Sequence, residues 1–106
     1  MVSVGFLIRI EAKPDRVQDV ENMLKSAVDH VREEGVASGW YALRLGPTSY
    51  AIFDAFADEA GRDAHWEANG ATLSGPQAAE LFAAPPTVER VDIVAAVLPG
   101  EQLPQP

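Results

Sequence analysis

Between Gly39 and Gly70 the chain has the pattern of two β-strands joined by a tight turn and followed at once by a short helix. Apolar and aromatic residues favour strands over 39–45 and 50–57, and the intervening GPTS has the composition of a turn. Asp58 is a favoured helix N-cap, and the helix is expected to run to about Ala68 before Gly70 ends it. A hairpin that continues directly into a helix restricts the fold to mixed α and β architectures.

The N-terminal part of the chain predicts one strand and one long helix. Apolar residues alternate with other residues from Val4 to Ala12, which is the period of a strand. From Arg16 to Glu34 they recur every three or four positions instead and form one helical stripe, which comprises Val17, Val20, Leu24, Ala27, Val28 and Val31. Asp15 is the expected N-cap of this helix, and Gly35 is its expected left-handed C-terminal residue.

The C-terminal part predicts a further short helix, a strand and a tail. Pro76 suits the first turn of a helix, and Pro85-Pro86 would end it. Thr87 to Leu98 is rich in Val and Ile of both parities, as in a strand that is buried on both faces. Residues 99–106, PGEQLPQP, are expected to form a mobile tail or an arm on a partner subunit.

The resulting order is β-α-β-β-α-(α)-β, which predicts a ferredoxin-like α+β fold in one domain over residues 1–98. In this fold, helices cover one face of a four-stranded antiparallel sheet and leave the other face bare. Apolar residues of both parities indicate that the bare face is not solvated. A second copy packed sheet to sheet would cover it, so we expect a homodimer.

The composition excludes several classes of function. The chain has no Cys, which excludes disulfides and thiolate metal sites, and its two His residues lie far apart, so no metal site is expected. The formal charge of -8 would repel nucleic acid and anionic membranes. No apolar run approaches the roughly 20 residues that span a bilayer, and MVSVGFLIRI lacks the features of a signal peptide. We therefore expect a cytoplasmic protein without nucleic-acid or membrane partners.

Three passages resemble the antibiotic biosynthesis monooxygenase superfamily, a group of dimeric α/β-barrel proteins. They are FLIRIEAKPDRVQDVENML, which combines the first strand with the long helix; YAIFDAFADEAGRDAHWEANG, which is the most specific; and the closing TVERVDIVAAVLP. The resemblance covers Phe6 to Leu98. It implies the fold and the dimer more firmly than it implies a reaction.

Three functions are compatible with this resemblance. The first is a cofactor-independent monooxygenase that oxidises a small aromatic or quinol substrate with dioxygen. The second is a non-catalytic small-molecule-binding or stress-associated module of the same fold. The third is a haem-binding protein with His65 as iron ligand, but the haem-degrading branch carries an Asn on the first strand and a Trp before the second helix. The corresponding positions here are Ile8 and Ala55, which argues against this function. We expect no cofactor.

His65 is the candidate catalytic residue. A neutral imidazole in a cleft could accept a phenolic proton, because its pKa lies near neutral pH. The resulting electron-rich anion could reduce dioxygen directly. The alternative is a structural His that caps backbone groups or packs beneath the sheet. Ala60, Ala64 and Ala68 are taken as the core stripe of its helix, which places His65 near the core and Trp66 further from it.

Asp54 is unusual because it lies between Phe53 and Phe56. A buried carboxylate needs a partner, and Arg9 and Arg44 are the expected ones. The pair would be either a structural bridge at the dimer interface or a charged group that shapes a pocket.

The candidate substrate-binding residues come from the hairpin and its helix: Trp40, Tyr41, Arg44, Phe53, Asp54, Trp66 and Asn69. An aromatic-lined pocket would suit a flat molecule, although core or interface packing explains most of these aromatics equally well. A tight turn would pair residues whose numbers sum to about 95. This register would place Tyr41 opposite Asp54, with Trp40 and Phe53 together on the other face.

Overall fold

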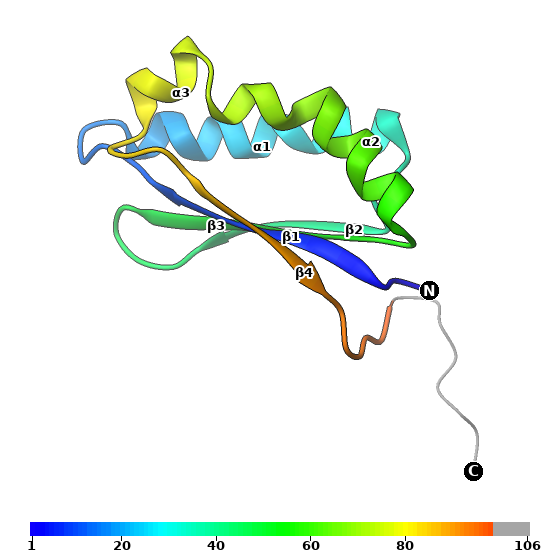
Figure 1. The fold of residues 1–106 in the computed structure, drawn as a ribbon. Coiled ribbons are helices and arrows are strands. Elements are labelled where there is room, and N and C mark those ends of the chain that lie inside the picture. Colours follow the sequence, from blue (N-terminus) through cyan, green and yellow to red (C-terminus); the bar gives the residue numbers. More distant parts are fainter. Residues whose placement is uncertain (99–106) are drawn as a thin grey trace.

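The computed structural model describes residues 1–98, in which a four-stranded sheet lies under a layer of helices (Figure 1). The strands are β1 (Val4–Glu11), β2 (Gly39–Arg44), β3 (Ser49–Phe56) and β4 (Thr87–Asp92). The helices are α1 (Val17–Glu34), α2 (Glu59–Asn69), the short 3-10 helix η1 (Gly70–Leu73) and α3 (Pro76–Leu81). The strand order is β2-β3-β1-β4, and all neighbouring strands are antiparallel. The predicted ferredoxin-like α+β fold is confirmed, whereas the predicted tail 99–106 lies outside the described residues.

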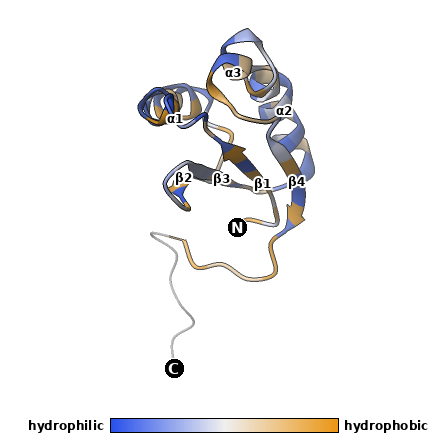
Figure 2. Ribbon diagram, turned by 90° about the vertical axis from the view of Figure 1, so that its left-hand side faces the viewer, coloured by the Kyte–Doolittle hydropathy of each residue, from blue (hydrophilic) through white to orange (hydrophobic). Residues whose placement is uncertain are grey.

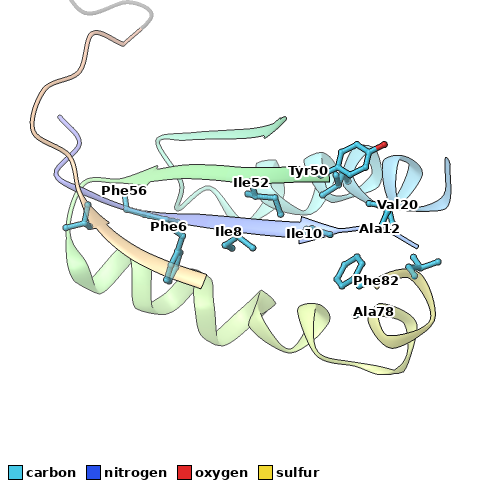
Figure 3. Close-up of a cluster of buried hydrophobic side chains, with 13 residues drawn as sticks. Phe6, Ile8, Ile10, Ala12, Val20, Tyr50, Ile52, Phe56, Ala78 and Phe82 are labelled. Atoms are coloured by element: carbon cyan, nitrogen blue, oxygen red, sulfur yellow. The ribbon is translucent and has the colours of Figure 1, made fainter. Parts of the chain in front are cut away.

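The core lies between the sheet and the helices (Figure 3). β1 is the central contributor, because its four even-numbered apolar residues are at most 6% exposed: Val4, Phe6, Ile8 and Ile10. The long helix α1 buries Val20 and Leu24 against them. Burial of each such side chain typically stabilises the fold by about 1.5–3 kcal/mol, so the period of two in β1 determines which face the helices cover.

Asp58 and Gly35 have the roles at helix ends that the sequence predicts. The carboxylate of Asp58 accepts a hydrogen bond from the backbone N–H of Gly61 at 2.9 Å, and Gly35 adopts the left-handed conformation with φ 68°. The prediction of Asp15 as N-cap of α1 is wrong. Arg16 occupies that position without a side-chain cap, because the backbone N–H of Arg16 is bonded to the carbonyl of Lys13 in a turn and its side chain pairs with Asp19.

The predicted last strand, Thr87 to Leu98, is too long. β4 ends at Asp92, which forms the final pair with Val4. One further backbone bond, from Ile93 to Ser3, follows this pair. Beyond it, residues 93–98 leave the sheet on the side away from the helices (Figure 1), and Val94 is 98% exposed. The prediction that the last strand is buried on both faces is also wrong, because β4 is an edge strand whose residues are all exposed except the partly buried Val91.

The predicted register of the hairpin is wrong by one residue. Residue numbers of facing pairs sum to 94, so that Trp40 faces Asp54 and Tyr41 faces Phe53. The shift arises because the backbone N–H of Leu45 bonds to the carbonyl of Ser49, which closes the hairpin over three residues instead of four. A slip of one residue exchanges the faces of a strand. Trp40 and Asp54 therefore share the helix-covered face, and Tyr41 and Phe53 share the opposite one.

The opposite face of the sheet is not covered by any helix of residues 1–98 (Figure 2). Its middle is apolar, although charged side chains such as Arg9 and Glu89 also lie on it. Leu7, Phe53 and Tyr41 lie in one row across β1, β3 and β2. Tyr41 is 51% exposed and Leu43 is 42% exposed. We call this surface the open face and define it by Leu7, Tyr41, Leu43, Ala51, Phe53, Ala55 and Val91. Within the part of the chain that is described, no helix is long and apolar enough to cross a membrane.

Candidate functional site

A cavity of about 300 Å³ lies between the sheet and the helices α1 and α2. Its lining is mainly aromatic and aliphatic, and both Trp residues of the chain contribute to it. The sheet contributes Phe6, Ile8, Trp40, Ile52 and Asp54. The helical layer contributes Met23, Leu24, Ser26, Ala27, His30, Val31, His65, Trp66, Asn69, Gly70, Thr72, Leu73 and Gln77. An apolar cavity with a few convergent polar groups is the usual form of a small-molecule site.

His65 is held between two carboxylates at the polar end of this cavity. Its Nδ1 lies 2.5 Å from Oε1 of Glu34, at the end of α1, and its Nε2 lies 3.4 Å from Oδ2 of Asp54, on β3. The side chain of His65 is 8% exposed. Asn69, one turn further along α2, donates to Oε2 of Glu34 at 2.6 Å and to the carbonyl of His65 at 3.0 Å. The imidazole is therefore fixed in orientation from three elements of the fold.

Asp54 is the most deeply buried member of this group, at 1% exposure. Its Oδ1 accepts a hydrogen bond from the backbone N–H of Phe6 at 3.1 Å. Its Oδ2 is also buried but accepts no hydrogen bond, because the contact with His65 has the distance of an ion pair without hydrogen-bond geometry. A carboxylate oxygen that has an ion-pair contact but no hydrogen bond can still accept one from a donor bound in the cavity.

The protonation of His65 follows from these neighbours. Burial disfavours the charged imidazole, but the contacts with Asp54 and Glu34 outweigh this effect and raise the pKa of His65 above its ordinary value. In the imidazolium form, Nδ1–H donates to Glu34 and Nε2–H points toward Asp54. The cluster of Glu34, Asp54 and His65 then has two negative charges and one positive charge. We call these three residues the carboxylate–imidazole cluster.

Aromatic rings form the wall beside the cluster. The indole of Trp66 packs on the ring of Phe6 with centroids 5.3 Å apart, and the ring of Phe56 lies 5.2 Å from the imidazole of His65. Trp66, expected to lie further from the core than His65, is partly buried, packs against the core cluster and lines the cavity. Flat apolar walls with a single polar end favour a planar ligand with one or two hydrogen-bond donors.

The sequence-predicted residues lie at three places in the structure. His65, Trp40, Asp54, Trp66 and Asn69 come together at the cavity. Tyr41 and Phe53 lie on the open face instead, because of the register described above. Arg44 pairs with Glu21 and lies beside the ring of Tyr50, at a distinct groove along β2.

The prediction that Arg9 or Arg44 pairs with Asp54 is also wrong. Arg9 lies 3.9 Å from Glu89, and Arg44 pairs with Glu21, so neither reaches Asp54. Its charged partner is His65. The corrected register explains the difference: Asp54 points into the helix-covered side, where α2 supplies the imidazole, whereas Arg9 has the parity of the open face.

Sequence patterns did not identify two further candidate residues, Glu34 and Arg62. An acidic residue in the last turn of a helix is unfavourable for the helix dipole, but the exposed Glu33 shares this position, so the sequence alone does not single out Glu34. Arg62 is 6% exposed, and its guanidinium donates to the carbonyls of Gly5 and Val91. The assumed core stripe of Ala60, Ala64 and Ala68 is wrong, because these residues are exposed. The inward stripe of α2 is polar and runs through Arg62, His65 and Asn69, at the three-and-four spacing of a helix face.

Within residues 1–98, no group of three or more His, Cys, Asp or Glu side chains has an arrangement that could hold a metal ion. The haem comparison depends on Ile8 and Ala55. Ile8 lines the cavity, whereas Ala55 has the parity of the open face. The titratable side chains that line the cavity are therefore Asp54, His65 and His30, whereas Glu34 does not line it but contacts His65. The other polar side chains of the lining are Ser26, Asn69, Thr72 and Gln77.

Solved structures share this fold. A Nitrosomonas europaea protein of unknown function is 39% identical, with a TM-score of 0.87 over 95% of this chain and 98% of that chain. A second Nitrosomonas europaea protein, provisionally named an antibiotic biosynthesis monooxygenase, is 14% identical, with a TM-score of 0.74 over 87% of this chain and 90% of that one. A Caulobacter crescentus protein with the same provisional name is 17% identical, with a TM-score of 0.70 over 89% and 92% of the two chains. No protein-family model and no curated protein matches the chain.

Proposed function

This chain belongs to the same family as the Nitrosomonas europaea protein of unknown function, and we propose that it is a cofactor-independent monooxygenase that oxidises a small hydroxyaromatic substrate with dioxygen. The observation that most directly supports this proposal is the buried Oδ2 of Asp54, which accepts no hydrogen bond and lies 3.4 Å from the imidazole of His65. A phenolic O–H that enters the cavity would satisfy this oxygen. The provisional names of distant relatives with the same fold agree with this reaction class.

In this proposal, Asp54 and not His65 accepts the proton. Both ring nitrogens of His65 face carboxylates, and its raised pKa favours the imidazolium, which has no free lone pair. Transfer of the phenolic proton to Oδ2 of Asp54 would leave a phenolate beside a cationic imidazolium. This opposite charge stabilises the anion as it forms. His65 is therefore an electrostatic partner in the reaction.

The oxidation balances without an external reductant. A phenol with a free para position supplies four electrons to dioxygen. One oxygen atom bonds to the para carbon, and the other leaves as water with the phenolic hydrogen and the para hydrogen. The product is a quinone. The aromatic walls formed by Trp40, Trp66 and Phe6 would hold the ring, and burial would limit access of bulk water to the anion.

Consumption of dioxygen with α-naphthol tests the proposal, with a naphthoquinone as the expected product. Asp54→Asn keeps an oxygen that can accept from the backbone of Phe6 but removes the proton acceptor, so the rate should fall about 100-fold or more. Glu67→Gln removes a carboxylate from the exposed side of α2 and should leave the rate unchanged. Absence of dioxygen consumption across a panel of naphthols and hydroquinones would contradict the oxygenase function.

A second candidate is a non-catalytic binding module with the same cavity. The observation in its favour is that His65 is locked between Glu34 and Asp54, as structural ion pairs are. Binding of α-naphthol without dioxygen consumption would support this function. A haem-binding function is not proposed, because an axial ligand needs a free imidazole nitrogen and both nitrogens of His65 face carboxylates.

A homodimer through the open face belongs to the same proposal. The exposed row of Leu7, Phe53 and Tyr41 presents apolar surface in a pattern that favours a protein interface. A two-fold interface uses the same surface of both subunits, so the apolar row of one subunit would face the apolar row of its partner. The cavity lies on the other side of the sheet, so each subunit would keep its own site.

A further inference from the structure

Glu34 does not line the cavity, but it contacts His65 at the polar end of the cavity and brings there a negative charge that the proposed reaction does not itself require. We infer that Glu34 is a specificity-determining residue: it makes the carboxylate–imidazole cluster net negative, so that the site takes uncharged hydroxyaromatic rings and rejects the same rings when they carry a carboxylate. This inference deepens the proposed function, because it defines the substrate class of the same site.

The first step is the charge of the cluster. Asp54 alone would balance the imidazolium of His65 and leave a neutral pair. Glu34 adds a second carboxylate at 2.5 Å from Nδ1 of the ring, and its side chain is only 19% exposed. The three groups together then carry a net charge of -1. Because the cluster is shielded from water, this charge acts on a ligand in the cavity more strongly than a surface charge would.

The second step is the position of the cationic side chains. Among the cavity-lining residues of the described chain, none is Lys or Arg, and the only basic side chain besides His65 is the exposed His30. Arg62 is buried on the same helix but does not line the cavity. Its Nη1 donates to the carbonyls of Gly5 and Val91, and its buried Nε makes no hydrogen bond within the described residues. Arg90 pairs with Asp63. A ligand carboxylate would therefore lose its hydration without gaining a guanidinium partner.

The third step is the nature of the polar contacts that remain. Asp54 offers a hydrogen-bond acceptor through Oδ2, which a hydroxyl can satisfy and a carboxylate cannot. The amide of Asn69 is already engaged by Glu34 and by the carbonyl of His65. The whole chain has a formal charge of -8, which also disfavours the approach of anions. The lining also contains Ser26, Thr72 and Gln77, which are uncharged and offer no counter-charge to a carboxylate. The charge of the site thus favours hydrogen-bond donors that carry no negative charge.

The experiment compares α-naphthol with 5-hydroxy-1-naphthoate, which is the same ring system with one added carboxylate. Binding is measured by calorimetry, and quenching of Trp40 and Trp66 reports occupancy independently because both line the cavity. The wild-type protein should bind the hydroxynaphthoate at least about tenfold more weakly than α-naphthol. Equal affinities, or failure of α-naphthol to bind, would overturn the inference.

Variants at position 34 separate charge from shape. Glu34→Gln retains the hydrogen bond to Asn69 and removes the charge. In slightly acidic buffer, where His65 stays protonated, the variant should reduce the ratio of the affinities for α-naphthol and for 5-hydroxy-1-naphthoate at least about threefold. Glu34→Asp retains the charge and should keep the wild-type discrimination. Glu33→Gln removes the neighbouring exposed carboxylate and should also keep it. Unchanged discrimination in Glu34→Gln that still binds α-naphthol would overturn the assignment.

Dioxygen consumption is measured on the same samples, so the two proposals fail separately. Selective binding without dioxygen consumption would retain the charge selectivity and contradict the oxygenase. If α-naphthol and 5-hydroxy-1-naphthoate cause dioxygen consumption at equal rates, the oxygenase function is supported and the charge selectivity is contradicted.

Discussion

The imidazole of His65 lies 2.5 Å from the carboxylate of Glu34, although the two residues are 31 positions apart in the chain. This contact joins the C-terminal end of α1 to the middle of α2. The second contact of His65, with Asp54, extends this connection to β3. The candidate site is therefore also a point where three elements of the fold are linked by charge, and its protonation should affect stability.

The stability contributed by His65 should depend on pH. The folded pKa of His65 is raised above its ordinary value of 6.5, so the protonated ring stabilises the folded state. This contribution is fully present below about pH 6.5 and is lost as the pH rises through the folded pKa. In urea unfolding from about pH 6 to about pH 9, wild type should therefore lose stability relative to His65→Gln as the pH rises.

His30→Gln is the control for this experiment, because it also removes an imidazole but at an exposed position. Its stability difference from wild type should vary less with pH. A His65 contribution that grows with rising pH would contradict the ion-pair arrangement.

Gly5 should be intolerant of a side chain. A Cβ atom at this position would lie 2.2 Å from the backbone carbonyl oxygen of Asp54, so β1 and β3 could not keep their present approach. The neighbouring bond from the backbone of Phe6 to Asp54 would shift with them. Gly5→Ala should lower the free energy of unfolding by about 1–3 kcal/mol, measured by urea denaturation.

Gly46→Ala provides the comparison, because nothing lies within 4 Å of a Cβ at that position in the hairpin loop. It should change the free energy of unfolding by less than about 0.5 kcal/mol. Equal effects of the two substitutions would show that the close approach at Gly5 does not limit the packing of the strands.

The sequence predicted the elements well because their signals are local. The alternation in β1, the apolar stripe of α1, the cap at Asp58 and the left-handed Gly35 each depend on residues a few positions apart. Pairing across strands is different, since a three-residue and a four-residue hairpin loop fit the same GPTS segment. One backbone bond from Leu45 to Ser49 decides between them, and with it the face of every side chain in β2.

The candidate site was predictable only in part for the same reason. His65 and Asp54 stood out as unusual residues in their segments, and the structure brings them together. Glu34 belongs to a run of charged residues at the end of α1 that resembles an ordinary solvated helix end. Its role depends on how α1 packs beside α2, and no local pattern encodes that packing. The polar inward stripe of α2 was not predicted, because the alanines of this helix, which indicate a core face in the sequence, lie on its exposed side.

Phe6 should be the most sensitive position of the cavity wall. Its ring is 1% exposed and contacts Trp66 at 5.3 Å and Phe56 at 6.2 Å between centroids. Phe6→Ala should lower the free energy of unfolding by about 3–5 kcal/mol and alter the fluorescence of Trp66. Val94→Ala, at a residue that is 98% exposed, should change neither quantity measurably. A small effect of Phe6→Ala would mean that the helices do not rest on β1 as described.

The open face should determine the oligomeric state. Leu43 is 42% exposed on this face, so Leu43→Lys leaves the core of the subunit intact while it places a charge in the proposed interface. Analytical ultracentrifugation should give a dimeric mass for wild type and a largely monomeric mass for the variant, because an unpaired buried charge is costly. Val88→Lys is the matched control: Val88 is 39% exposed but has the parity of the helix-covered side of the sheet. A monomeric wild type, or equal dissociation by both substitutions, would contradict an interface through Leu7, Phe53 and Tyr41.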